Sequence, residues 1–391
     1  MLASSYPRAE GDTASIFLRY LAQSLARRGL DVTVLAPAEG EGGVSVEEGI
    51  RVHRVRYFPA KWQKLAYGSG IMPNLRRNPC LWLEVPFFVA AMSAALLRLA
   101  RSERPDLVHA HWLLPQGLIA LPAKYVFGIP VISSAHGTDA FALQGHASRI
   151  LKRLVVTKSD AWTSNTAATS AAAAGNGSVS MPSIIPMGVD VAKFSRGDGA
   201  GLRRGFGEEE LVLLFVGRLV ESKGCRDLLR AYAMLSPALR ARTRLWFVGE
   251  GDQRTALERH AAELPEAARV RFWGAIDHGR LPDFYAAADL VAVPSRDIEG
   301  QSVVLLEAFA AACCVVAART GGIGFVVEDN HSGRLVDAGD PGRLAHAIDM
   351  LLADGALRAR LAANARRQAE EYDWDKIAAR FEELYRHTIA R

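Results

Sequence analysis

Glu299 and Glu307 flank residues 300–306, and the second glutamate lies in a stretch that is otherwise apolar from position 303 to position 318. A buried polar group costs roughly 2 to 7 kcal/mol unless something hydrogen-bonds it, and a carboxylate costs more. Glu307 therefore needs a polar partner. We expect that partner to be a hydroxyl group of a bound ligand.

Ser302 is a good N-cap residue just before this apolar stretch. Val303, Val304 and Leu305 would then be the first helical residues, with backbone amides free to bind an anion. The segment thus combines an anion-binding site at a helix N-terminus with a buried carboxylate that can accept hydrogen bonds from hydroxyl groups. A nucleotide sugar offers a diphosphate for the first and ribose hydroxyls for the second.

The other unusual groups of the second half each follow a predicted strand. Ligands of open parallel sheets bind outside the carboxyl ends of the strands, so these groups would share one edge. They are Gly217-Arg218, Gly249-Glu250-Gly251, Trp273-Gly274, Pro294-Ser295 through Glu299, and Gly321-Gly322.

Arg218 and Lys223 would present a guanidinium and an ammonium group from one strand end to the same diphosphate. An ion pair between Arg218 and Glu307 is the structural alternative. Both arrangements are open at this point.

Strand-like runs alternate with helical periods, which predicts an α/β fold with parallel sheets. The clearest helix of the first half spans 14–28 and ends before Gly29. Only residues 1–4 remain for a first strand, so either that strand is short or the chain start has been set downstream of the natural one. Later strands are expected at 31–35, 106–109, 130–134 and 160–163.

Residues 182–207 are rich in proline, glycine and charge, and they are expected to link two Rossmann-like domains. A last amphipathic helix would begin near Tyr372. The second sheet is expected to use strands at 211–216, 244–248, 269–272, 289–293, 313–317 and 333–336.

The composition is globular, with 391 residues, 50% hydrophobic and 23% charged, and the length favours two domains. The four cysteines have no metal-ligand spacing and favour a reducing compartment such as the cytoplasm. The apolar run 85–97 falls short of the ~20 residues that a membrane span needs. No signal peptide is recognisable.

Positive charge is concentrated in the first half, which has 19 basic and 13 acidic residues up to position 190, against 28 and 29 after it. The interleaved cations and aromatic residues could form a surface for anionic lipid or an anionic acceptor, or only a solvated face and a core. Nucleic acid binding is not expected, because no recognition module is present. The residues are Arg51, Arg54, Arg56, Lys61, Lys64, Arg76 and Arg77, with Tyr57, Phe58, Trp62 and Tyr67.

Taken in order, these segments resemble the retaining glycosyltransferases of family 4, which have the GT-B fold. The resemblance covers nearly the whole chain, and the second half carries its specific part. The motifs are Gly217-Arg218-Leu219, Glu221-Ser222-Lys223-Gly224, Phe247-Val248-Gly249-Glu250-Gly251, Phe272-Trp273-Gly274, Pro294-Ser295, the Glu299 and Glu307 pair, His136-Gly137-Thr138-Asp139, and Tyr6-Pro7 with Gly11.

The resemblance implies an acceptor domain over 1–185, a donor domain over 186–371, parallel sheets facing across a cleft, and a final helix, 372–391, that crosses back to the first domain. Arg218 and Lys223 would grip the donor diphosphate, aided by the amides of the 303–305 turn. Glu307 would bind the ribose, and Glu299, near Ser302, would contact the transferred sugar. Gly249, Glu250 and Trp273 would hold the base.

On the acceptor side the resemblance implies roles for Gly11, His111, His136 and Asp139. His136 would touch the donor sugar or stabilise the transition state, while Asp139 would lie near the acceptor. Three departures from the family pattern affect details: Ala312-Cys313-Cys314 after the apolar helix, Gly324-Phe325 after Gly321-Gly322, and Gln301-Ser302 beside Asp297, which could share the role of Glu299.

The implied reaction transfers a sugar with retention to a hydroxyl acceptor, which is lipid-linked or soluble, in bacterial glycan or glycolipid assembly. No metal or cofactor is expected, because cations and helix amides can neutralise the leaving diphosphate. The rival hypotheses are a protein that binds a nucleotide sugar without transferring it and a nucleotide-sugar epimerase. A phosphorylase would need a lysine that binds pyridoxal phosphate, and a nicotinamide-dependent oxidoreductase would need a Gly-x-Gly-x-x-Gly fingerprint. Neither feature is evident in the sequence.

Overall fold

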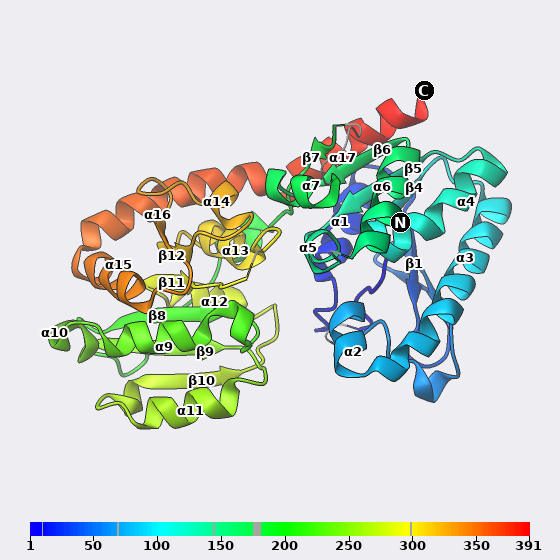
Figure 1. The fold of residues 1–391 in the computed structure, drawn as a ribbon. Coiled ribbons are helices and arrows are strands. Elements are labelled where there is room, and N and C mark those ends of the chain that lie inside the picture. The colour runs from blue at the N-terminus through cyan, green and yellow to red at the C-terminus, as the bar shows by residue number, and fades with distance from the viewer. Residues whose placement is uncertain (10, 69, 144, 175–180, 298) are drawn as a thin grey trace. The chain divides into compact units, whose positions relative to one another are not determined.

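The computed structural model describes residues 1–9, 11–68, 70–143, 145–174, 181–297 and 299–391 (Figure 1). The chain divides into two compact units. The first unit comprises Met1–Met187 and Trp374–Arg391, and the second comprises Gly188–Asp373. The last helix therefore belongs to the same unit as the first half of the chain.

The first unit has seven described strands: β1 (Thr33–Pro37), β2 (Gly43–Glu47), β3 (Ile50–Val55), β4 (Val108–His111), β5 (Val131–Ala135), β6 (Ala161–Ser164) and β7 (Ser183–Ile184). They pair in the orders β1-β3-β2 and β4-β5-β6-β7, and every pair is parallel except β2 with β3. Leu2 joins the two groups through isolated parallel bridges to Leu35 and Ala110. The expected first strand is thus reduced to single bridges in this structure.

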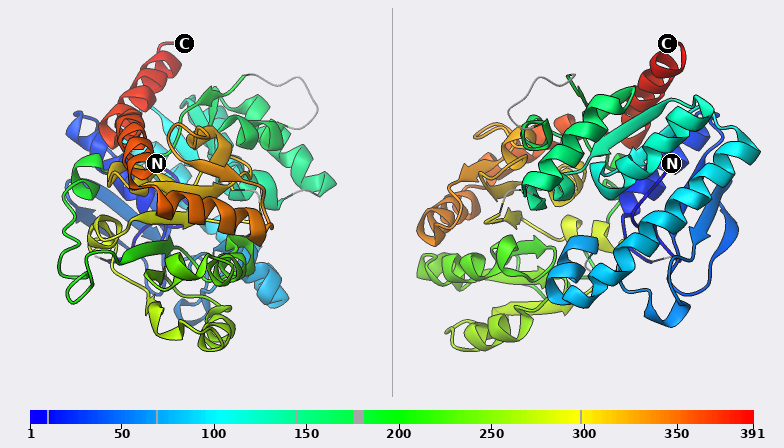
Figure 2. Two further views of the ribbon diagram at one scale, coloured as in Figure 1. Left: turned by 90° about the vertical axis from the view of Figure 1, so that its left-hand side faces the viewer. Right: turned by 45° about the vertical axis from the view of Figure 1, so that its right-hand side comes forward.

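Helices cover this sheet, and α1 packs against α17 (Figure 2, blue and red). On α1, Leu18, Leu21 and Leu25 are buried, and on α17 Ile377 and Phe381 are buried in the same core. The α-helices of the unit are α1 (Ile16–Arg27), α2 (Ile71–Arg77), α3 (Glu84–Glu103), α4 (Leu118–Phe127), α5 (Thr138–Ala142), α6 (His146–Lys158), α7 (Ala167–Ala174) and α17 (Trp374–Ile389), with short helices η1 (Ala60–Trp62), η2 (Pro79–Leu83) and η3 (Leu113–Gly117).

The prediction from the apolar run 85–97 that this segment is too short to span a membrane is wrong. The helical segment that contains the run, Pro79–Glu103, is 25 residues long, and by length and composition alone it could cross a membrane. However, Phe88, Met92 and Leu96 on one side of α3 are buried in the core of the first unit. We therefore treat α3 as a core helix with one exposed side.

The second unit contains a parallel sheet in the order β10-β9-β8-β11-β12-β13. All six predicted strands are confirmed to within two residues at each end. They are β8 (Leu211–Val216), β9 (Thr243–Val248), β10 (Val270–Gly274), β11 (Leu290–Val293), β12 (Val315–Ala318) and β13 (Arg334–Val336).

Helices surround this second sheet, and its core is separate from that of the first unit. On β8, residues 211–215 are all buried, as a strand covered on both faces requires. The helices are α8 (Val191–Phe194), α9 (Cys225–Ala233), α10 (Pro237–Arg240), α11 (Arg254–Ala262), α12 (Leu281–Ala286), α13 (Val303–Ala310), α14 (Ile323–Val326), α15 (Pro341–Ala353) and α16 (Gly355–Ala369), with short helices η4 (Glu221–Lys223), η5 (Ala267–Arg269) and η6 (Glu370–Tyr372).

The predicted linker 182–207 is mostly a packed part of the second unit, which corrects the sequence interpretation. Its helix α8 packs against α12 and α13. Arg203 donates to the carboxylate of Asp289 at 2.8 Å and to the carbonyl of Glu210 at 2.6 Å. The segment lacks helical periodicity because individual polar contacts and close glycine packing hold it, rather than an apolar stripe.

Candidate active site

Gly217 and Gly249 directly follow β8 and β9, Gly274 ends β10, and these glycines allow the strand ends to lie close together. The Gly217 amide donates to the carbonyl of Val248 at 2.9 Å, and the Gly249 amide donates to the carbonyl of Gly274 at 2.7 Å. Gly249 has φ 137°, and a Cβ there would lie 1.9 Å from the Gly217 oxygen. Only glycine fits this position, so no side chain covers the backbone at this point of the carboxyl edge.

The two predicted phosphate cations lie at this edge. Arg218 is exposed and forms no ion pair with any residue that the structure describes. Lys223 lies in η4 and forms a 2.8 Å ion pair with Glu299. Ser295 also hydrogen-bonds the Glu299 carboxylate. The structure therefore brings Lys223 and Glu299 together, as a shared donor site requires.

Helix α13 begins where the sequence predicts. Ser302 is its N-cap residue with extended backbone angles, although its side chain makes no capping hydrogen bond. Val303, Val304 and Leu305 form the first turn. The Gly322 amide donates to the carbonyl of Glu299 at 2.7 Å, which fixes the chain just before the helix.

Glu307 has protein partners, and this corrects the expectation that a ligand must satisfy it. Tyr285 donates its hydroxyl to Oε2 at 2.7 Å, and Nε2 of His278 contacts Oε1 at 2.8 Å. The alternative ion pair with Arg218 is not formed, because these two groups hold the carboxylate. A carboxylate can accept about four hydrogen bonds, so Glu307 keeps acceptor capacity for ribose hydroxyls.

A row of polar groups continues behind this carboxylate. Lys193 Nζ, on α8, lies 3.1 Å from Nδ1 of His278. Since a lysine ammonium can only donate, His278 accepts at Nδ1 and donates from Nε2 to Glu307. Burial lowers the pKa of Lys193, and burial together with the Glu307 charge raises the pKa of Tyr285 well above its usual value.

Sequence reasoning missed this support because its members are far apart along the chain and none belongs to a motif. Phe194 packs edge-on against both His278 and Tyr285, with ring centroids 5.6 Å apart in each case. Tyr285 lies near Leu281 and Phe284 in α12, and a hydroxyl group beside these apolar residues was the available signal.

The predicted base-binding residues are at the carboxyl edge, with one difference. The Trp273 ring packs edge-on against Trp246 and Phe284, and Arg271 stacks on it at 3.6 Å. The side chain is therefore used in packing, and its backbone remains for a base. Glu250 forms an ion pair with Arg254.

Asp297, the alternative to Glu299, is exposed and adjoins a position outside the described residues. Its neighbour Arg296 forms a two-pronged ion pair with buried Asp227, at 2.5 and 2.6 Å. This pair anchors the loop between β11 and α13 to α9. Neither residue was predicted from the sequence to have a role.

In the first unit, buried His109 and His111 lie in β4, and half-buried His136 directly follows β5. His111 Nδ1 lies 3.0 Å from His136 Nε2, and the two rings stack with centroids 5.2 Å apart. His109 contacts Tyr385 and Ser134, both at 2.6 Å. Burial lowers the pKa of His136 to about 3 and the pKa values of His109 and His111 well below 6.5, so all three are neutral.

Asp139 orders the loop that carries His136. Its carboxylate accepts from the amides of Leu113 at 2.7 Å and His136 at 3.0 Å. Burial raises its pKa. This bonding gives Asp139 a structural role, whereas its predicted acceptor role stays a prediction.

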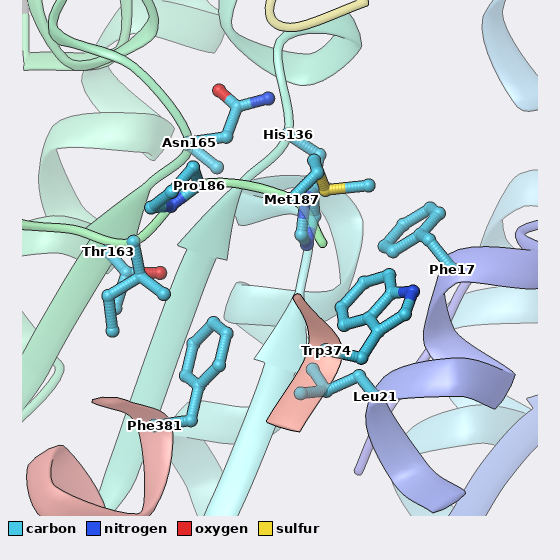
Figure 3. Close-up of a pocket in the computed structure, with 11 residues that line it drawn as sticks. Phe17, Leu21, His136, Thr163, Asn165, Pro186, Met187, Trp374 and Phe381 are labelled. Carbon is cyan, nitrogen blue, oxygen red and sulfur yellow. The ribbon is translucent and has the colours of Figure 1, made fainter. Parts of the chain in front are cut away.

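His136 also lines a small pocket inside the first unit (Figure 3). The pocket is about 10 Å³, near the minimum for one water molecule, so it cannot hold a sugar. Phe17 and Trp374 lie on one side of it. Gly11, with φ 81°, lies in the exposed loop before α1, and no described contact joins it to His136.

No group of three or more histidines, cysteines, aspartates or glutamates that could hold a metal ion occurs among the residues described. The cysteines Cys80, Cys225, Cys313 and Cys314 are all free thiols.

Comparison with known proteins agrees with this geometry. Residues 13–188 match the glycosyl transferase 4-like domain, and residues 203–368 match glycosyl transferases group 1. The chain is 24% identical to sucrose-phosphate synthase of Thermosynechococcus elongatus, with a TM-score of 0.80 over 100% of this chain and 98% of that one. It is 22% identical to Anabaena Alr3699/HepE, solved with UDP and glucose, with a TM-score of 0.76 over 99% and 98% of the chains. These structures define the class: the chain has the GT-B fold of glycosyltransferases.

The particular family follows from sequence. The chain is 33% identical to D-inositol 3-phosphate glycosyltransferase of Acidothermus cellulolyticus, over 96% of this chain and 86% of the relative. It belongs to the group 1 glycosyltransferases, family 4, and it is a glycosyltransferase. The predicted family and fold class are confirmed.

Proposed function

We propose that this glycosyltransferase moves a sugar from a nucleotide-diphosphate sugar to a hydroxyl acceptor with retention of configuration and without a metal ion. The observation that carries the proposal is the gathering of Lys223, Glu299 and the amino end of α13 at one edge of the second sheet. Arg218 lies exposed at the end of β8 on the same edge.

In the proposed reaction, an acceptor oxygen attacks the anomeric carbon while the bond from that carbon to the β-phosphate oxygen breaks. The acceptor proton passes to the departing phosphate, so no protein nucleophile is needed. Arg218, Lys223 and the amides of Val303, Val304 and Leu305 would neutralise the leaving diphosphate. Glu299 would contact the transferred sugar in place of its present partner, Lys223.

The relatives suggest substrates to try first. Alr3699/HepE was solved with UDP and glucose, so UDP-glucose is the first donor. The Acidothermus relative is named for inositol 3-phosphate, and an anionic acceptor suits the net positive charge of the first 190 residues. A phosphorylated cyclitol is therefore the first acceptor, and a lipid-linked hydroxyl acceptor the second.

The test measures release of nucleoside diphosphate from UDP-, GDP- and ADP-sugars, with and without acceptor, and the anomeric configuration of the product by NMR. Retention and acceptor-dependent release are expected. Glu307→Ala should abolish transfer, and Lys223→Met should weaken nucleotide binding by about tenfold to a hundredfold, since bonds to charged groups contribute about 1.5–3 kcal/mol.

Two outcomes would count against the proposal. Donor binding without release under any acceptor would favour the alternative, a protein that binds a nucleotide sugar without transferring it. Loss of activity in EDTA that magnesium restores would contradict metal independence.

A further inference from the structure

One segment of the first unit is rich in cations. Residues 49–83 contain seven arginines or lysines and no aspartate or glutamate. Arg51, Arg54 and Arg56 form ion pairs with Glu103, Glu47 and Glu41. The other four cations are Lys61, Lys64, Arg76 and Arg77. Glu84, which follows, is buried and accepts hydrogen bonds from the amides of Lys64 and Leu65, each at 3.2 Å. The nearest carboxylate after the segment is thus hidden from solvent.

Large apolar side chains are exposed among these cations. Trp62 is 55% exposed, Trp82 56%, Leu83 71% and Phe87 55%. Isolated exposed hydrophobic residues are normal, but a contiguous group that includes two tryptophans marks an interaction site. We call this set the basic aromatic face: Lys61, Trp62, Lys64, Arg76, Arg77, Trp82, Leu83 and Phe87.

The face is contiguous because its segments pack on one another. The Phe58 and Phe87 rings lie 5.3 Å apart, and the Tyr57 and Phe88 rings lie 5.1 Å apart. Asn74, on α2, donates to three carbonyls of the segment that holds Lys64. The helix η2, which carries Trp82 and Leu83, packs against α2 and α3.

We propose that the basic aromatic face docks this glycosyltransferase onto a membrane surface that contains anionic lipids. Tryptophan favours the headgroup region, and lysine and arginine are attracted to anionic headgroups. The proposal goes beyond the sugar transfer proposed above and does not depend on which donor is used.

Other modes of covering the face fit less well. A symmetric dimer through it would place like charges opposite each other, which is unfavourable. A membrane-spanning α3 would require Phe88, Met92 and Leu96 to leave the core of the first unit. Binding in the plane of the headgroup region needs neither change.

Cys80 is a native labelling site at which this interaction can be measured. Cys80 lies on η2 within the face and is exposed, whereas the other three cysteines are buried. Burial raises the pKa values of Cys225 and Cys314 to about 12 and that of Cys313 further, so these thiols react slowly. A polarity-sensitive maleimide dye should therefore label Cys80 in the unmodified protein.

The experiment uses vesicles of equal parts phosphatidylglycerol and phosphatidylcholine, and vesicles of phosphatidylcholine alone. The labelled protein should sediment with the anionic vesicles with a blue shift of the dye, and high salt should release it. Each basic residue contributes about fivefold, so Lys61→Glu with Arg77→Glu should weaken binding at least about 25-fold. Trp62→Ser with Trp82→Ser should weaken binding to the anionic vesicles, and the binding that remains should still be released by high salt.

A matched charge change elsewhere is the control. Arg259→Glu with Arg367→Glu changes two exposed arginines of the second unit and should bind vesicles like the wild type. Thermal melting and nucleotide release should match the wild type in every variant, so failure of this proposal is distinct from failure of the sugar-transfer proposal.

Three outcomes would overturn the docking proposal. The first is that the wild-type protein does not sediment with the anionic vesicles. The second is an equal loss of binding in the control, which would show that only net charge matters. The third is preferential binding of single-stranded polynucleotide over vesicles, which would assign the face to nucleic acid.

Discussion

At the scale of single residues, Glu307 depends on Tyr285 and His278 for its orientation. We predict that Tyr285→Phe and His278→Asn reduce discrimination between UDP and its 2′,3′-dideoxy analogue, because the carboxylate is no longer aimed at the ribose. Tyr285→Phe should also cost about 1–3 kcal/mol of folding stability, since it removes a buried partner of a charged group.

Calorimetric titration of the two nucleotides gives the discrimination ratio. The Glu307→Gln variant gives the discrimination ratio expected when the ribose contact is lost. If Tyr285→Phe or His278→Asn lowered only the folding stability, its discrimination ratio would stay at the wild-type value. A wild-type ratio in both His278→Asn and Tyr285→Phe would contradict the orienting role.

The neutral histidines of the first unit predict acid sensitivity. Their folded pKa values lie below 6.5, the usual value, and that of His136 is about 3. The unfolded state therefore binds more protons as the pH falls below 6.5, and stability present above that pH is progressively lost toward pH 3. Linkage gives up to about 1.4 kcal/mol per pH unit for each histidine.

Urea unfolding at several pH values between 7 and 5 measures this slope. His109→Gln with His111→Gln should flatten it, whereas the same change at the exposed His260 should leave it as it is. A slope that is the same in both variants would show that other groups cause the acid sensitivity.

At the scale of elements, the segment before β8 is held by close backbone packing. A Cβ at Gly197 would lie 2.1 Å from the carbonyl oxygen of Pro282 on α12, whereas a Cβ at Gly201 would meet nothing within 4 Å. Gly197→Ala should therefore destabilise the second unit by about 1–3 kcal/mol, and Gly201→Ala should be nearly neutral. Thermal melting of the two variants tests this, and equal melting temperatures would contradict the packed role of the segment.

The strands of the second sheet were predictable because each is a short apolar run followed by glycine or a polar group, as in Leu211–Val216. The hairpin of β2 and β3 was missed. Its two-residue turn, Glu48-Gly49, has positive φ at both positions, and neither strand is a purely apolar run.

The same limit applies to the site. The N-cap at Ser302 is a local signal, and the sequence predicts it correctly. The partners of Glu307 come from α12 and the loop before it, so only tertiary structure brings them together. Pairing of Lys223 with Glu299 likewise depends on the register of β8 beside β11.

At the scale of the whole molecule, each unit buries its own core, so a ligand of one unit need not stabilise the other. We predict that UDP alone slows amide hydrogen exchange at Gly217, at η4 and in the first turn of α13, because its diphosphate is bound by these groups. Exchange in peptides from residues 1–187 and 374–391 should change little. Mass spectrometry of the full chain with saturating UDP makes the measurement, and Lys223→Met, used at the same UDP concentration, should lose most of the protection. Protection centred on His136 rather than on α13 would move the nucleotide site to the first unit and contradict the assignment of the donor to the second.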